Sequence, residues 1–234
     1  MDSYSFEPIG YVESPYKEKF GIPRQAGLVE YARGRVHILP PYARPEAFSG
    51  LESSTHIWLL FLFHAGRDGD WRPTVRPPRL GGNKRIGVFA TRSGFRPNPI
   101  GMSVVRLESI STGAEGVSLN VSGLDLMNGT PILDIKPYIP YADALIEANN
   151  GIAPVAPEKP LSVIYSDRAD AVLLENDGRD DLRRLITETL AFDPRPAYKR
   201  SDDNKTYGMR LTGFEVRWRL ETEGVVLVED VIAV

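Results

Sequence analysis

The chain has 234 residues, of which 42% are hydrophobic and 25% charged, a profile typical of a globular protein with one large or two modest domains. It contains no cysteine, which excludes disulfides, thiolate metal sites and thiol nucleophiles. The three histidines lack ligand spacing, so we expect no metal site. The chain shows neither a signal-peptide pattern nor an apolar run long enough to span a bilayer, and we therefore expect a cytoplasmic protein without a membrane segment.

The formal net charge of −3 is unevenly distributed along the chain. Residues 67–106 carry nine Lys and Arg against two acidic residues, and residues 192–220 carry seven against four. Two basic segments in an otherwise acidic chain are typical of local contacts with phosphate groups rather than of uniform polyanion binding. Solvated surface faces have the same composition, and the sequence leaves both interpretations open.

Short apolar runs predict a series of β-strands in the first 135 residues. The longest run, within residues 54–64, suits a strand that is covered on both faces. Residues 44–48 predict a helical turn, and the Pro-, Arg- and Gly-rich residues 66–83 predict a long irregular loop. Many short strands with little helix favour a β-barrel or a β-sandwich. The predicted strands cover residues 6–12, 27–39 (as one strand or two), 54–64, 86–91, 102–109, 117–121 and 132–135.

The pattern changes after residue 144. Residues 144–160 contain Asn149-Asn150-Gly151 and three prolines, and predict a linker. Beyond the linker, apolar residues with helical spacing predict an amphipathic helix. Residues 214–221 alternate between apolar and polar and precede a second apolar run across a short turn, which predicts a hairpin. We therefore expect a small α+β domain over residues 161–234, with the helix formed around Leu182, Leu185, Ile186 and Leu190.

The most distinctive stretch is residues 90–101, which place Asn98 between two prolines and also contain Arg92 and Arg96. The prolines fix φ, and two glycines bracket the rigid piece with permissive backbone. Apolar segments on both sides predict a stiff loop between two strands. Polar groups on such loops often build binding sites, although a rigid surface turn with solvated arginines has the same pattern.

Residues 90–107 resemble the signature of the tRNA adenine-37 N6-methyltransferases, the tRNA-methyltransferase O family. Further segments resemble the same family in the same order, so the similarity covers nearly the whole chain. These segments are residues 20–25, 75–83, 129–138, 193–198 and 213–218.

The resemblance implies an S-adenosylmethionine-dependent enzyme that methylates the N6 amine of threonylcarbamoyl-adenosine next to the anticodon of tRNA. It also implies a homodimer and a mainly β fold, with a single-sheet β-barrel catalytic domain over residues 1–145 and a tRNA-contacting α+β domain over residues 161–234. No Gly-x-Gly-x-x-Gly motif joins a strand to a helix, so the cofactor site is not of the Rossmann type. The alternative is a non-catalytic RNA- or nucleotide-binding module with a β-barrel core.

By resemblance, ten residues bind the cofactor. A guanidinium such as that of Arg92 pairs bidentately with a carboxylate, which the cofactor carries. The family usually has Leu or Ile followed by Asp where this chain has Met127-Asn128, so one carboxylate is lost. Strand packing of Met102 and a core role for His64 are the structural alternatives. The predicted cofactor residues are Pro23, Arg24, Gln25, His64, Arg92, Met102, Asp125, Leu126, Met127 and Asn128.

Two polar residues are candidates for the catalytic step. Methylation of an adenine amine develops positive charge on its nitrogen, and acceptors near the N–H groups stabilise that charge. Asn98 and the carbonyls of its neighbouring prolines suit this role, and Asp134 is a second acceptor or base. An ion pair of Asp134 with Lys136 or Arg106 is the structural alternative.

Arginine and aromatic side chains on rigid loops suit single-stranded RNA, which predicts a set of tRNA contacts. Arg217 and Arg219 alternate with apolar residues, which predicts a solvent-facing basic ridge on one strand. An ion pair between Arg195 and Asp193, and packing of Tyr198 at a domain junction, are the alternatives. The candidate contacts are Arg96, Arg195, Tyr198, Lys199, Arg217 and Arg219.

Overall fold

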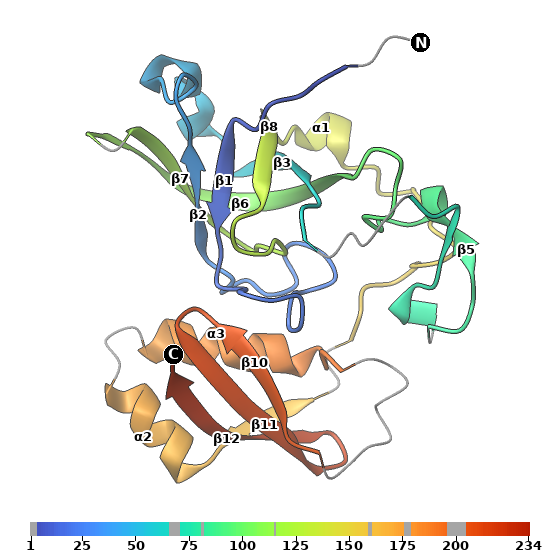
Figure 1. Ribbon diagram of the computed structural model, residues 1–234, viewed down its shortest axis with the longest axis vertical. Helices are drawn as coiled ribbons and strands as arrows, with labels where there is room; N and C mark the ends of the chain where they lie inside the picture. The colour runs from blue at the N-terminus through green and yellow to red at the C-terminus, as the bar shows by residue number, and fades with distance from the viewer. Residues whose placement is uncertain are drawn as a thin grey trace.

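The structure, a computed structural model, describes residues 4–65, 71–80, 82–114, 116–158, 161–175, 179–195 and 205–234. It contains a β-barrel from the N-terminal part of the chain and a smaller α+β domain from the C-terminal part (Figure 1). The predicted fold class is thereby confirmed. Tyr198 and Lys199, two of the predicted RNA contacts, lie outside the described residues. No helix of the described part is long and apolar enough to cross a membrane.

Six antiparallel strands close into the barrel in the order β1, β2, β7, β6, β3, β8, and β8 pairs back onto β1. Closure pairs both edges of the sheet, so the barrel has no open edge that invites aggregation. The strands are β1 (Gly10–Glu13), β2 (Gly34–Ile38), β3 (His56–Leu62), β6 (Ile100–Gly113), β7 (Gly116–Ser122) and β8 (Pro131–Pro137).

Strand β3 corrects one prediction. Its side chains alternate, with Ile57, Leu59 and Phe61 buried inside the barrel and the intervening residues only partly buried. The prediction that this strand is covered on both faces was wrong, because a small closed barrel has one interior that each strand fills with every second side chain. The outward apolar residues of β3 therefore lie on the barrel surface.

The segment between β3 and β6 is largely irregular. It contains a two-stranded sheet of β4 (Thr74–Val75) and β5 (Ile86–Gly87) and the 3-10 helix η3 (Pro78–Leu80). The strand predicted over residues 86–91 was wrong beyond Gly87, because the 3-10 helix η4 (Val88–Ala90) turns the chain there.

Three other short helices belong to the barrel domain. The 3-10 helix η1 (Pro45–Phe48) confirms the helical turn predicted at residues 44–48 and buries Phe48. The 3-10 helix η2 (Leu51–Ser53) precedes β3, and α1 (Pro140–Asp143) follows β8.

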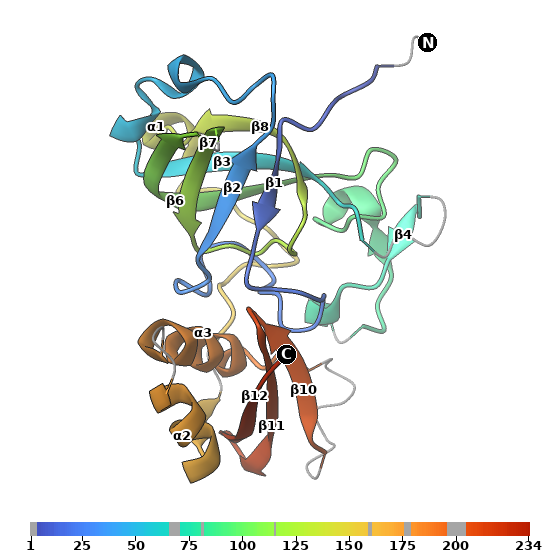
Figure 2. The ribbon, with the colours of Figure 1, turned by 60° about the vertical axis from the view of Figure 1, so that its left-hand side comes forward.

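The C-terminal domain is a four-stranded sheet in the order β10, β11, β12, β9, with two helices on one face (Figure 2). The predicted helix is confirmed, since its four spaced apolar residues are buried, and so is the predicted hairpin. The sequence did not predict β9, α2 or β10. The elements are β9 (Ser162–Tyr165), α2 (Asp167–Glu175), α3 (Arg179–Ala191), β10 (Tyr207–Leu211), β11 (Phe214–Thr222) and β12 (Val225–Ala233).

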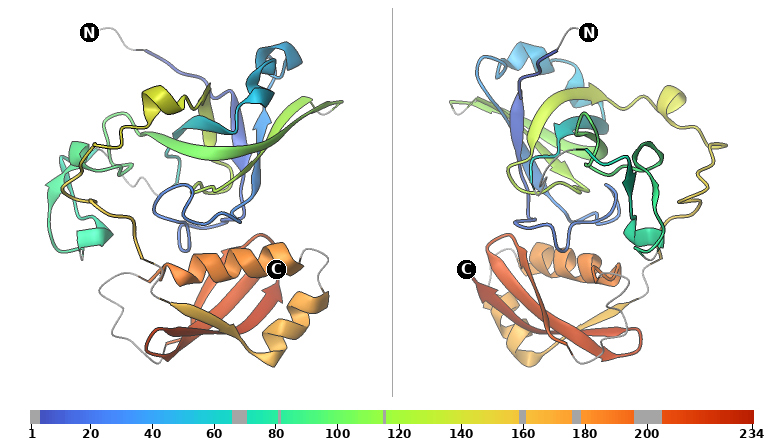
Figure 3. Two further views of the ribbon diagram at one scale, coloured as in Figure 1. Left: turned by 180° about the vertical axis from the view of Figure 1, so that it is seen from behind. Right: turned by 45° about the vertical axis from the view of Figure 1, so that its right-hand side comes forward.

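The two domains share one hydrophobic core. Tyr16 of the barrel domain is fully buried and forms an isolated antiparallel bridge with Leu211 of β10. Nearby, the Tyr31 N–H donates a hydrogen bond to the Glu188 carboxylate at 3.1 Å. The linker of residues 144–158 runs outside these contacts and passes beside the segment of β4 and β5 before it reaches the C-terminal domain (Figure 3). The C-terminal domain is therefore packed against the barrel as well as tethered to it.

Candidate functional site

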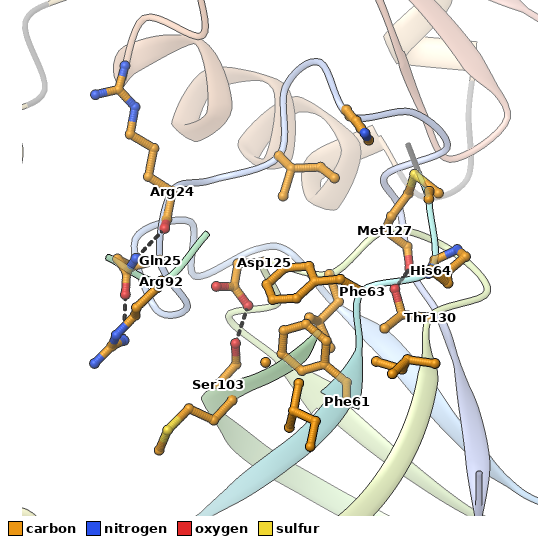
Figure 4. A pocket seen from close by; sticks show the side chains of 18 of the residues that line it. Arg24, Gln25, Phe61, Phe63, His64, Arg92, Ser103, Asp125, Met127 and Thr130 are labelled. Atoms are coloured by element: carbon orange, nitrogen blue, oxygen red, sulfur yellow. Dashed lines mark hydrogen bonds between the residues drawn. The ribbon is translucent and has the colours of Figure 1, made fainter. Parts of the chain in front are cut away.

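A cavity of about 470 Å³ opens at the end of the barrel where β3 ends and β6 begins, a size typical of sites for small organic ligands. Its lining residues fall in four segments that are distant in the sequence, namely residues 19–25, 61–65, 91–103 and 125–130. Strand ends converge in a closed barrel, which brings these segments together. Figure 4 shows polar side chains at both ends of the cavity and two phenylalanines between them.

One end of the cavity carries groups of opposite charge. The Arg92 guanidinium donates a hydrogen bond to Gln25 Oε1 at 2.6 Å, and Gln25 Nε2 donates to the Arg24 carbonyl at 2.5 Å (Figure 4). Beside them, Ser103 Oγ donates to Asp125 Oδ1 at 2.7 Å. This end therefore presents a fixed cation and a fixed carboxylate to the same ligand.

Asp125 is held in an unfavourable environment for its charge. Burial raises the pKa of its carboxyl group, while hydrogen bonds from Ser103 and from the backbone of Asp125 and Ala26 and the charge of Arg92 act in the opposite direction. Burial is the largest of these effects, so the net shift is upward. A buried carboxylate of this kind stores an electrostatic cost that a cationic ligand relieves.

The middle of the cavity explains two glycines of the stretch of residues 90–101, which we call the central loop. Phe61 and Phe63 lie edge to face with ring centroids 5.1 Å apart. A Cβ atom at Gly101 would come within 2.2 Å of the Phe61 ring, and one at Gly94 within 2.8 Å of the Phe63 ring. These positions therefore need glycine because the aromatic rings press on the backbone, and not for flexibility.

His64 lies at the other end with Met127 and Thr130 (Figure 4). Its side chain is exposed, so the alternative of a core histidine is wrong. Partial burial and the nearby charge of Lys19 lower the pKa of the imidazole. Lys19 itself lines the cavity and places another cation at its rim.

Several hydrogen bonds brace the central loop. Arg96 Nη1 donates to the carbonyls of Thr91 at 2.6 Å and Val88 at 3.2 Å. Pro99 accepts a hydrogen bond from the Phe63 N–H at 2.8 Å, which fixes the loop to the end of β3. Arg96, predicted as an RNA contact, thus braces the loop while lining the cavity. Asn98 is exposed and lies outside the lining, two residues from Arg96.

Nine of the ten predicted cofactor residues line the cavity together. Asn128 does not, because its Oδ1 accepts hydrogen bonds from the Ser14 N–H and Lys17 Nζ. Met102 is 48% exposed, so ordinary core packing does not account for it.

Asp134 forms the ion pair with Lys136 that the sequence analysis gave as the alternative to a catalytic role. Its carboxylate pairs with Lys136 Nζ at 2.9 Å, and it lies outside the cavity lining. The ion pair satisfies the carboxylate on the barrel surface, so the predicted role of Asp134 as an acceptor or base finds no support in this geometry.

One predicted RNA contact of the C-terminal domain, Arg195, needs correction. Arg195 is only 3% exposed and its Nε pairs with Asp193 Oδ1 at 2.8 Å, so it is a buried structural cation. Arg217 pairs with Glu215, and Arg219 with Glu221 and Glu229. Neighbouring carboxylates therefore pair with both arginines of the predicted basic ridge, and contact of this ridge with RNA stays a prediction.

Sequence reasoning missed several lining residues, including Lys19, Phe61, Phe63, Ser103 and Thr130. Ser103 had a usable signal, since it is a polar residue at an inward position of β6 and such a residue needs a hydrogen-bond partner. The others have no local pattern that separates them from ordinary surface or core residues. Among the described residues, no group of three His, Asp or Glu side chains is arranged to hold a metal ion.

Comparison with known proteins assigns the family. The model of the tRNA-methyltransferase O N-terminal domain matches residues 11–144, and that of the TrmO C-terminal domain matches residues 158–233. The chain belongs to the tRNA-methyltransferase O family. The resemblance found in the sequence is thereby confirmed, and family membership identifies an enzyme rather than a non-catalytic binding module.

Individual members of the tRNA-methyltransferase O family are similar over the whole chain. The tRNA (adenine(37)-N6)-methyltransferase of Escherichia coli is 50% identical over 226 residues, which cover 96% of each chain. A Pseudomonas aeruginosa protein with the provisional name of an S-adenosylmethionine-dependent methyltransferase is 48% identical over 98% of each chain. The crystal structure of TrmO from Pseudomonas aeruginosa superposes with a TM-score of 0.83 at 41% identity, covering 99% of each chain.

The burial of Asp125 leads to a prediction about stability. Asp125→Asn keeps an acceptor for Ser103 but removes the buried charge, so we expect the free energy of unfolding at pH 7 to rise by about 1 kcal/mol. Because the folded-state pKa is raised, the cost in the native protein disappears as the pH falls through that pKa, and the difference between the two proteins should vanish in acid. Urea unfolding at a series of pH values measures this difference. A variant that is less stable at pH 7 would contradict the assignment.

Proposed function

We propose that this protein transfers a methyl group from S-adenosylmethionine to the N6 amine of adenine 37 in tRNA, with the threonylcarbamoylated adenosine as its preferred substrate. The names of the Escherichia coli and Pseudomonas aeruginosa relatives support the reaction and the cofactor. The observation that carries the proposal is the cavity whose charged end holds Arg92 and Asp125 side by side. A cytoplasmic location, where tRNA is modified, stays a prediction.

The charged end fits the amino-acid part of S-adenosylmethionine, which has a carboxylate and an ammonium on one carbon. Arg92 is oriented by Gln25 and suits the carboxylate, while Asp125 suits the ammonium. Phe61 and Phe63 provide apolar surface for the less polar parts of the molecule. When bound, the cofactor supplies an electrophilic methyl group on a sulfonium.

Asn98 is the residue best placed to assist the acceptor amine. It is exposed next to the cavity on a loop that two prolines and Arg96 hold in place. Its amide oxygen accepts a hydrogen bond from the N–H of the target amine, which stabilises the positive charge that develops on nitrogen. Asp134 is paired with Lys136 outside the cavity, so we assign this role to Asn98 alone.

The charges around the cavity suit an anionic substrate. Among the lining residues that the structure describes there are four cations, Lys19, Arg24, Arg92 and Arg96, against the single carboxylate of Asp125. Phosphates of the anticodon loop and the carboxylate of a threonylcarbamoyl group are both anions that this rim attracts. The contribution of the C-terminal domain to tRNA binding stays a prediction, because the arginines first proposed for it are paired.

We also propose that the protein is a homodimer. The outward residues of β3 and β6 form an apolar face, since Leu60 lies opposite Met102 and Leu62 opposite Ile100 in the antiparallel register. Exposed apolar patches of this kind commonly mark protein interfaces. Because Met102 also lines the cavity, a second copy on this face would lie beside the cofactor site.

The dimer proposal predicts the effect of a charge on this face. Leu60→Glu places a carboxylate at the centre of the apolar face, where burial without a partner is costly, so we expect the variant to be a monomer. Sedimentation equilibrium at micromolar concentration compares it with the native chain. A native chain that sediments as a fully active monomer would rule out the dimer.

Cofactor affinity should depend on Arg92. Loss of a charge-assisted, bidentate contact in Arg92→Ala should weaken S-adenosylmethionine binding by about 10- to 100-fold. Arg92→Lys should restore only part of the affinity, because lysine lacks the planar fork. Isothermal titration calorimetry measures both, and equal affinity in the alanine variant would refute the assignment.

Nucleoside mass spectrometry of tRNA incubated with the protein and S-adenosylmethionine tests the function. We expect an added methyl group on threonylcarbamoylated adenosine 37, and less on the same tRNA without the threonylcarbamoyl group. Asn98→Ala should lower turnover about 100-fold with nearly unchanged cofactor affinity, because its proposed partner is the target amine. Equal loss of both properties would show that Asn98 is structural, and an unmethylated adenosine 37 would refute the proposed reaction.

A further inference from the structure

A short segment after β1 contacts both the cavity wall and the C-terminal domain. We call this segment, Ser14 to Tyr16, the strap. On its cavity side, Ser14 Oγ donates to the Leu126 carbonyl at 2.6 Å, and the Asn128 N–H donates to the Tyr16 carbonyl at 2.8 Å. Ser14 is only 3% exposed, so water does not substitute for these bonds. The strap thus holds residues 126–128, of which Leu126 and Met127 line the cavity, by backbone and side-chain contacts.

The other side of the strap is held by the C-terminal domain. The Thr212 N–H donates to the Pro15 carbonyl at 2.7 Å, next to the bridge between Tyr16 and Leu211. Thr212 has φ of 54°, which is costly for a β-branched residue and persists only where the surroundings impose it. The hydrogen bond to the strap is one such constraint.

Tyr16 is fully buried within the hydrophobic core that the two domains share. Burial raises the pKa of its phenol above the usual range, and the charges of Asp125 in the cavity and Glu188 in α3 add to the rise. Tyr16 connects the two domains through packing and electrostatics together.

A second wall of the cavity rests on the same part of the C-terminal domain. Gly21, with φ of 94°, directly precedes the wall of residues 22–25. A Cβ atom added at Gly21 would lie 3.3 Å from Met209 Sδ of β10. The close approach of β10 therefore supports the cavity wall of residues 22–25, just as the strap supports the wall that contains Leu126 and Met127.

We propose that the C-terminal domain is a structural part of the methyl-donor site, with Ser14 as a positioning residue, so that ligand occupancy and domain packing stabilise each other. The inference rests on the proposed function for the identity of the ligand. Coupling between two binding events is reciprocal. A ligand that orders the walls of the cavity should therefore strengthen the contact between strap and β10, and loosening that contact should weaken ligand binding.

Hydrogen exchange of the full chain with and without S-adenosylhomocysteine tests the coupling. We expect the ligand to slow exchange several-fold in the peptide of residues 207–213, which lies outside the cavity lining. In Ser14→Ala the dissociation constant should rise about 5- to 30-fold, corresponding to one buried hydrogen bond, and the slowing at residues 207–213 should be lost.

Ser166→Ala is the matched control. Ser166 Oγ donates to the Glu229 carbonyl at 2.7 Å and accepts from the Ala169 N–H at 3.1 Å, a pattern close to that of Ser14. It lies between β9 and α2, and its loss should lower the melting temperature while ligand affinity and protection stay native.

Lys17→Met tests the same link from the surface in case Ser14→Ala does not fold. Lys17 Nζ donates to the Ser14 carbonyl at 3.1 Å and to Asn128 Oδ1 at 3.0 Å, and its exposed position tolerates substitution. We expect a smaller loss of affinity, of about 2- to 5-fold. Ligand binding by the native chain without slower exchange at residues 207–213 would overturn the inference alone, as would native affinity in both Ser14→Ala and Lys17→Met. A native chain that binds no S-adenosylhomocysteine would refute the proposed function as well.

Discussion

The closure of six short strands into one barrel is the constraint on which the rest of the structure depends. A small barrel has a single interior, and every strand fills it with alternate side chains. Ser103 is a polar exception at an inward position of β6, and its hydroxyl is satisfied by Asp125. The exception lies where the strand ends converge on the cavity. Closure therefore places the partly buried carboxylate of Asp125 beside the outward apolar face of β3 and β6.

Much of the fold could be predicted from local patterns. Alternation sufficed for β7 and for the β11–β12 hairpin, and helical spacing sufficed for α3, because these periods are properties of the segment itself. β9 was missed because it has only four residues, and its parallel partner β12 begins about sixty residues later. The exposure of the outward face of β3 also depends on closure of the whole barrel, and no local sequence pattern indicates that closure.

The sequence predicted the candidate site less completely than the fold. Motif resemblance located the segments that line the cavity, but it did not give the direction of each side chain. Asn128 turns toward Ser14 and Lys17, although its neighbour Met127 lines the cavity. The pairing of Arg217 with Glu215 was predictable, because residues two apart share one face of a strand. The burial of Arg195 depends on tertiary packing and could not be predicted from the sequence.

The linker gives the interdomain contact a further property. Residues 144–158 pass on the outside of the segment of β4 and β5 (Figure 3), and Ile146 within them is 97% exposed. While this tether is intact, the C-terminal domain meets the barrel at an effective concentration on the order of millimolar, so a modest intrinsic affinity keeps the domains together. One proteolytic cut in the linker would turn this contact into a bimolecular one that dilution weakens. Intact chain and nicked chain would then differ in their sensitivity to protein concentration.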